Sequence, residues 1–82
     1  MEKKQKFNPI DEKATCKNIK QIMDKKNISP KEVQEALNLG SIQAVYKWIS
    51  PKMNAIPSTE NLVLLAQLFE CSLDDILVYR SK

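Results

Sequence analysis

The sequence predicts an all-α fold, a compact five-helix bundle, and three observations support this. The 82 residues include a single Gly and only 6% aromatic residues, which argues against a loop-rich or all-β domain. Apolar side chains recur at helical spacing in several separate segments. Residues that cap helices precede these segments. With 43% apolar and 28% charged residues, the chain is long enough for one hydrophobic core and too short for two.

The first helix is expected from about Pro9 to Lys26. Asn8 followed by Pro9 is an N-cap and first-turn signal, and good helix formers follow. The apolar stripe on this helix comprises Thr15, Cys16, Ile19, Ile22 and Met23. Residues 1–8 lack an apolar period, so we expect a flexible basic N-terminal arm there and a folded domain at residues 9–80.

The second helix is expected to begin at Pro30. Ser29 can serve as its N-cap, and Glu32 stands three residues later, which completes a capping box. The predicted inward face of the helix comprises Val33, Ala36 and Leu37. It should be short, because Asn38 and Gly40 follow and both residue types accept the positive φ of a helix end.

A third helix is predicted from Ser41 to Ser50, with the Ser41 hydroxyl as its N-cap. At about 100° per residue, one side of it is apolar and should face the core. That side comprises Ala44, Val45, Trp48 and Ile49. The opposite side comprises Gln43, Tyr46, Lys47 and Ser50, all with hydrogen-bonding side chains.

The second and third helices, joined by a short turn that contains Gly, match the helix-turn-helix unit. A short anchored helix that exposes amide, phenol and ammonium groups suits the DNA major groove, where base edges offer matching donors and acceptors. An ordinary amphipathic surface helix would show the same pattern, so this stretch alone leaves both interpretations open.

A loop with two prolines is expected at residues 50–57, and two further helices follow it. Ser58 should cap a helix from Thr59 to about Phe69, the most hydrophobic of the five. Its core positions are Leu62, Leu65, Ala66 and Phe69. Ser72 and Asp75 form another capping box, which opens a fifth helix expected to run through Ile76 and Leu77 as far as Tyr79.

Composition excludes several classes of function. No run of about 20 apolar residues could cross a membrane, and no signal-peptide segment follows the first lysines, so we expect a cytoplasmic protein. The chain has no His, and Cys16 and Cys71 are far apart, which argues against a zinc site. Both cysteines are interpreted as small core residues. No cofactor, metal, catalytic residue or small-molecule ligand is predicted.

Charge is distributed unevenly along the chain. Residues 1–52 contain eleven Lys against six acids, whereas residues 53–82 contain two basic residues against four acids. The first part therefore carries a net charge of +5 and the second part −2. An anionic partner would meet the first part, although many cytosolic domains have a similar excess.

The sequence resembles the phage Cro and repressor type of helix-turn-helix domain, also called XRE-like or lambda-repressor-like. The resemblance covers about residues 14–78. Its matching pieces are Ile19-x-x-Ile22, Val33 to Leu37, Ser41-x-x-x-Val45-x-x-Trp48, Ile56-Pro57-Ser58, Leu62-x-x-Leu65-Ala66-x-x-Phe69 and Ser72 to Leu77. This resemblance implies a five-helix bundle and a bacterial transcription regulator, expected to be a repressor, that binds double-stranded DNA.

The resemblance leads to hypotheses about which residues contact the DNA. The residues expected to contact bases are Ile42, Gln43, Tyr46 and Lys47. The residues expected to contact phosphates are Lys31, Ser41, Ser50, Lys52 and Asn54. Many family members carry a phosphate-binding Gln near the start of the second helix, whereas this chain has Pro30, so Lys31 takes that role.

One small domain rarely binds tightly enough alone, so a homodimer on a palindromic operator is expected. The candidate dimer surface is the apolar tail from Ile76 to Tyr79. A second hypothesis is a protein-binding module of the same fold, such as an antitoxin or adaptor, since the exposed side of the third helix has one Lys only. An enzyme is the least favoured class, because no catalytic constellation is present.

Overall fold

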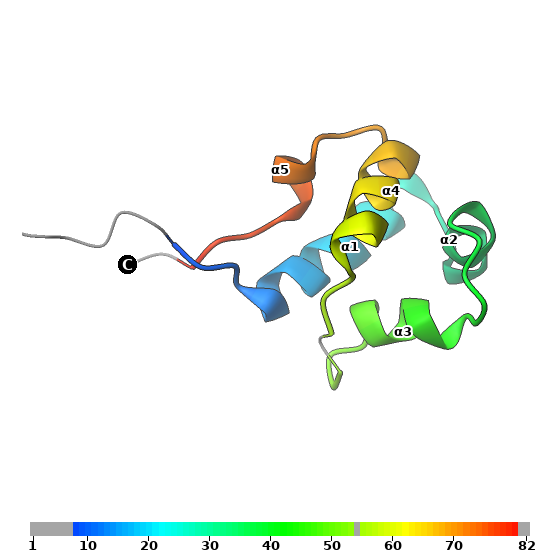
Figure 1. Cartoon of the computed structure of the whole chain (residues 1–82), viewed down its shortest axis with the longest axis horizontal. Helices are drawn as coiled ribbons and strands as arrows, with labels where there is room; N and C mark the ends of the chain where they lie inside the picture. Colours follow the sequence, from blue (N-terminus) through cyan, green and yellow to red (C-terminus); the bar gives the residue numbers. More distant parts are fainter. Residues whose placement is uncertain (1–7, 54, 81–82) are drawn as a thin grey trace, which may run out of the picture.

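A computed structural model describes residues 8–53 and 55–80 of the chain. Within those ranges the fold is all-α, as predicted, and its regular elements are five helices (Figure 1). In chain order they are α1 (Glu12–Lys26), α2 (Pro30–Ala36), α3 (Gln43–Ile49), α4 (Thr59–Phe69) and α5 (Leu73–Ile76). The two ends of the described chain meet in an isolated antiparallel bridge between Ile10 and Tyr79.

The helices pack around α1 and α4, which lie at the centre of the molecule (Figure 1). α3 packs against α1 and α2, whereas α4 packs against α1, α2 and α5. α2 and α3 therefore lie together on one side of the bundle, and α5 lies on another. This arrangement leaves α3 at the lower edge of the bundle in the view of Figure 1.

One hydrophobic core joins all five helices. Its buried members are Ile19, Met23, Val33, Leu37, Val45, Trp48, Leu62, Leu65, Ala66, Phe69 and Ile76. The predicted core positions of α4 are all confirmed. One predicted position on α2 is wrong, because Ala36 is exposed. α2 ends at Ala36, and the next residue, Leu37, has left the helix with φ −90° and ψ 0°. Val33 and Leu37 are buried, as predicted.

Three of the predicted helix starts are confirmed with their capping bonds. The Ser29 hydroxyl accepts from the Glu32 amide at 3.1 Å, and the Glu32 carboxylate accepts from the Ser29 amide at 2.7 Å. Ser58 caps α4, where its hydroxyl accepts from the Asn61 amide at 3.2 Å. A second capping box, formed by Ser72 and Asp75, opens α5. These bonds satisfy amides that have no partner within their helix.

The predicted start of the first helix is wrong. α1 begins at Glu12, and its N-cap is Asp11, whose carboxylate accepts from the Ala14 amide at 3.0 Å. The backbone of residues 9–11 pairs instead with residues 78–80, the C-terminal segment of the described chain. The Asp11 amide donates to the carbonyl of Val78 at 2.7 Å, and the Arg80 amide donates to the carbonyl of Pro9 at 2.8 Å. Extended pairing with a distant segment therefore replaces the first predicted turn.

The predicted end of the fifth helix is also wrong. α5 ends at Ile76, and Leu77 is extended with φ −75° and ψ 137°. Tyr79 is not helical, because it pairs with Ile10.

In the turn before α3, Asn38 has a positive φ, as predicted, with a value of 56°. Gly40 does not have a positive φ.

Two polar side chains of α1 hold the C-terminal segment in place. Thr15 is fully buried, and its hydroxyl accepts from the Val78 amide at 2.9 Å and donates to the Val78 carbonyl at 3.3 Å. The Asn18 amide group donates to the carbonyls of Asp75 and Ile76 at 2.8 and 3.0 Å. These bonds satisfy backbone groups at and beyond the end of α5 that no helix partner reaches.

Replacing Thr15 by valine is expected to destabilise the protein by about 1–3 kcal/mol, because the Val78 amide loses the hydroxyl to which it donates. The Val78 carbonyl keeps its bond from the Asp11 amide. Urea denaturation followed by circular dichroism would measure the difference. Thr15→Ser is the matched control, since it keeps the hydroxyl and should retain most of the stability. A Thr15→Val protein as stable as the wild type would contradict this role for the hydroxyl.

Candidate nucleic-acid interface

α3 is fixed to the bundle by its apolar side. Val45 is fully buried and Trp48 is 5% exposed, and both belong to the core. Ala44 and Ile49 are half-buried at the two margins of that side. The predicted inward side of α3 is therefore confirmed. Because a buried Trp has few alternative packings, this anchor determines which side of α3 faces outward.

The outward side of α3 is polar and accessible. Gln43 and Lys47 are exposed, and Tyr46 is 44% exposed. Ile42 and Ser50, at the two ends of the helix, are half-buried. Helical spacing places the exposed side chains of Gln43, Tyr46 and Lys47 on one surface of the bundle. That surface, defined by Gln43, Tyr46 and Lys47, is called the readout face below.

The start of α3 differs from the prediction. The helix begins at Gln43, and its N-cap is Ile42 with φ −70° and ψ −18°, so Ser41 is not the N-cap. The reason is a tight first turn, in which the Ile42 carbonyl accepts from the amides of Val45 and Tyr46 at 3.0 and 3.2 Å. The Ser41 hydroxyl still accepts from the Gln43 amide at 3.0 Å.

The segment after α3 folds back against the end of the helix. The Ser50 hydroxyl accepts from the Lys52 amide at 3.2 Å, and the Lys47 carbonyl accepts from the Ala55 amide at 3.0 Å. The thiol of Cys16 on α1 donates to the Ala55 carbonyl at 3.6 Å. Burial, and then the nearby Glu12 carboxylate, raise the pKa of Cys16, so the thiol keeps the proton that it donates.

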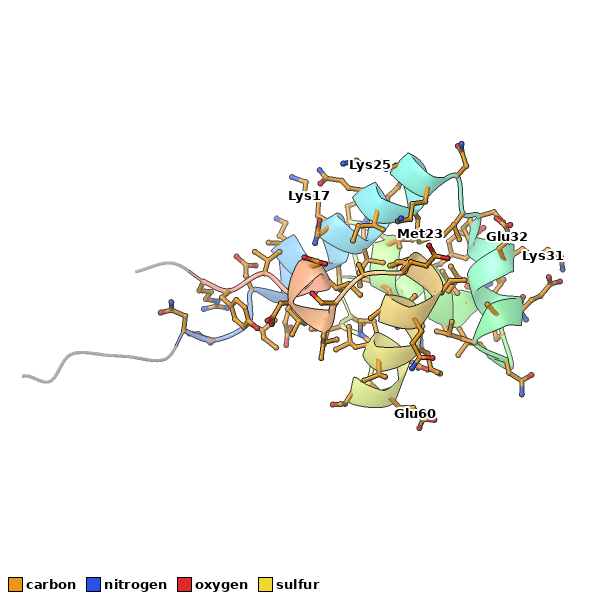
Figure 2. All side chains as sticks on the ribbon, turned by 90° about the horizontal axis from the view of Figure 1, so that it is seen from above. Lys17, Met23, Lys25, Lys31, Glu32 and Glu60 are labelled. Atoms are coloured by element: carbon orange, nitrogen blue, oxygen red, sulfur yellow. The ribbon has the colours of Figure 1, made fainter. Side chains whose placement is uncertain are left out.

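Most of the predicted contact residues lie together around α3. Ser41, Ile42, Ser50 and Lys52 border the readout face at the ends of the helix. Lys31 is separate, because it lies on α2 (Figure 2). Its ammonium pairs with the Glu35 carboxylate at 3.4 Å. Asn54 lies outside the described residues.

The electrostatics of this surface favour an anion. The sequence has no acidic residue between Glu35 and Glu60, a stretch that includes all of α3 and both of its flanking turns. The charged side chains of that stretch are Lys47 and Lys52, and both are exposed. A polyanion can therefore approach α3 without meeting a carboxylate of that stretch.

A family model for the Cro/C1-type HTH DNA-binding domain matches residues 18–82. This chain belongs to that family. The matched range includes α2, the turn and α3, which are the helix-turn-helix unit. Neither the curated proteins nor the solved structures gave a match to the chain. The Cro/C1-type assignment confirms the family and fold predicted from the sequence and indicates a DNA-binding regulator.

Three lysines of this Cro/C1-type domain were not predicted from the sequence to contact DNA. Lys13, Lys17 and Lys20 lie on α1 and border a cavity whose other walls come from Cys16, Ile49 and Pro51. Their spacing of four and three residues already indicated a common side of a helix. The sequence could not indicate that this side adjoins the end of α3, because Lys20 and Ile49 are distant in the chain.

Other kinds of site are not found in the part of the chain that the structure describes. No helix there is long and apolar enough to cross a membrane. Nor do three or more Cys, Asp or Glu side chains gather there in a group that could hold a metal ion. Both cysteines are free; Cys16 is buried as predicted, and Cys71 is only half-buried.

Proposed function

We propose that this Cro/C1-type domain is a sequence-specific regulator of transcription, and a repressor, that inserts α3 into the DNA major groove. The observation that carries the proposal is the readout face. Gln43, Tyr46 and Lys47 are exposed together on a short helix that Val45 and Trp48 hold rigidly in the core. A helix of this kind presents donors and acceptors at fixed positions to base edges.

Each residue of the readout face has a chemical role in the proposal. Gln43 pairs in bidentate fashion with an adenine, and Lys47 donates to O6 and N7 of a guanine. Tyr46 offers a phenol that both donates and accepts. Ile42 is half-buried, so it supplies a methyl contact to a thymine only at the edge of the surface.

Phosphate contacts would hold the readout face in register. Ser41 and Ser50 already accept amide hydrogens through their hydroxyl oxygens, which leaves each hydroxyl proton free for a phosphate. Lys31 must leave Glu35 to reach a phosphate, and an exposed pair of this kind contributes only about 0.2–1 kcal/mol. Lys52 and Asn54 complete the proposed set.

We also propose a homodimer on a palindromic operator, with half-sites about 34 Å apart. The predicted dimer surface needs a correction, since Ile76 is fully buried in the monomer core. The residues left for this contact are Leu77 and Val78, which are half-buried, and Tyr79, which is 46% exposed. In this proposal residues 9–80 form the DNA-binding domain. The basic arm expected at residues 1–8 lies, apart from Asn8, outside the described residues. The dimer acts in the bacterial cytoplasm.

Selection from a pool of randomised DNA duplexes tests the proposed function. We expect the protein to enrich one palindromic sequence and to bind it more tightly than unrelated duplexes by a factor of 10³ or more, as is typical of specific regulators. Weak and equal binding to every duplex, together with a stable protein partner in a pull-down, would favour the protein-binding module instead.

Neutralising Lys52 is expected to flatten the salt dependence of DNA binding. One lost phosphate contact should make the slope of log K against log salt concentration less negative by about 0.9. Fluorescence anisotropy of a labelled operator at several salt concentrations would measure this for Lys52→Gln. Lys25→Gln on α1 is the matched control and should keep the wild-type slope. An unchanged slope in both variants would assign Lys52 to the solvated surface.

A further inference from the structure

α1 carries a row of three lysines next to the end of α3. Lys13, Lys17 and Lys20 come from one side of α1 and border a cavity of about 230 Å³ together with Cys16, also from α1. The remaining walls come from Ile49, the last residue of α3, and Pro51 in the turn after it. This set of three lysines is called the α1 basic row below.

The charges of the α1 basic row are largely unneutralised. Among the residues that the structure describes, Lys13 and Lys17 form no ion pair and no side-chain hydrogen bond. Lys20 pairs with Asp24 at 3.1 Å, but both partners are more than half exposed, so the pair is weak. Lys17 projects outward from α1 (Figure 2). The row therefore keeps at least two free cations next to the end of α3.

The cavity itself does not suit a small-molecule effector. Its volume of about 230 Å³ is below the range of roughly 300–1,000 Å³ that is usual for such sites. The three lysines that line it are exposed, and lysine side chains usually pack their aliphatic stems on apolar surface while their ammonium groups reach solvent. A row of exposed cations suits an extended polyanion that passes over the surface.

We propose that the α1 basic row contacts the DNA phosphate backbone at the margin of the groove that α3 enters. This inference rests on the proposed function, because it places the same DNA along a second helix. The row spans eight residues, and the seven rises of about 1.5 Å between Lys13 and Lys20 give a length of about 10.5 Å. That length corresponds to roughly three base-pair steps of 3.4 Å, so the row can meet more than one phosphate of a strand.

A comparison of two double variants tests the α1 basic row. Lys13→Gln/Lys17→Gln removes the two unpaired cations of the row. Lys25→Gln/Lys26→Gln removes the same charge from the last turn of the same helix, outside the cavity walls. All four side chains are exposed, so both variants should fold, and thermal unfolding would verify this.

The salt dependence of DNA binding should separate these variants. We expect the slope of log K against log salt concentration to become less negative by about 1.8 for Lys13→Gln/Lys17→Gln and to stay at the wild-type value for Lys25→Gln/Lys26→Gln. The base preference of both variants should match the wild type, since phosphate contacts carry no direct sequence information. Equal slopes for both variants would overturn the proposed row.

The same measurements distinguish this inference from the proposed function. If Lys13→Gln/Lys17→Gln keeps the wild-type slope while Gln43→Ala loses base preference, the α1 contact is overturned and the readout face stands. If the wild type itself shows no base preference, the proposed function is overturned, and the slopes on nonspecific duplex still decide whether the α1 basic row contacts phosphates. Absence of any duplex binding overturns both.

Discussion

Replacing Trp48 by alanine is expected to destabilise the protein by about 3–5 kcal/mol, through lost apolar burial and the cavity left behind. Trp48 is 5% exposed and is part of the core that joins all five helices. A domain of 82 residues has a stability of about 4–12 kcal/mol, so the loss is a large share of the total. Chemical denaturation followed by circular dichroism would measure it, and DNA binding should weaken in parallel.

Trp48→Phe is the matched control for this prediction. A phenyl ring keeps much of the buried apolar area and should cost less than the alanine variant. Tyr46→Ala, on the exposed side of the same helix, should change stability much less. If Trp48→Ala melted at the wild-type temperature, Trp48 could not be the anchor of α3, and the outward orientation of the readout face would lose its physical basis.

The double variant Gln43→Ala/Lys47→Ala is expected to lose most of its discrimination between the operator and unrelated duplexes. Each bidentate contact to a base discriminates by about 1–3 kcal/mol, so two independent contacts should contribute roughly 2–6 kcal/mol. Both side chains are exposed, so the fold should persist. A competition assay between operator and random duplex would measure the loss for the double variant and for each single variant.

Ser50→Ala and Lys25→Ala serve as controls for that experiment. Ser50→Ala removes a proposed phosphate contact, so it should lower affinity for operator and random duplex alike and leave their ratio unchanged. Lys25→Ala removes a distant charge and should change neither value strongly. A double variant that retained the operator preference of the wild type would exclude Gln43 and Lys47 from base recognition.

Local features of the fold could be predicted from the sequence because they depend on contacts a few residues apart. The capping boxes at Ser29 and Ser72 and the cap at Ser58 each involve a bond across three residues. The inward side of α3 followed from helical spacing alone, because Val45 and Trp48 come to one side in any α-helix. Once that side faces the core, the residues on the opposite side of the helix, which form the readout face, must face solvent.

The errors at the two ends of the domain occurred where distant segments compete with local signals. Asn8-Pro9 is a good helix start by local criteria, yet the backbone of residues 9–11 bonds to residues 78–80. The same pairing keeps Tyr79 extended. The sequence places Thr15 in the apolar stripe of the first helix. In the structure its hydroxyl accepts from the amide of Val78, a residue 63 positions later. Single-sequence patterns contain no information about such partners.

The sequence by itself therefore determined the all-α class, the helix-turn-helix unit and the polar side of α3. Only the tertiary structure decided that the α1 lysines adjoin the end of α3 and that the two ends of the described chain pair with each other. The physical reason is the separation along the chain over which each interaction acts. Capping and helical periodicity act over three or four residues, whereas the neighbourhood of α1 and α3 results from burying Ile19, Val45 and Trp48 in one shared core.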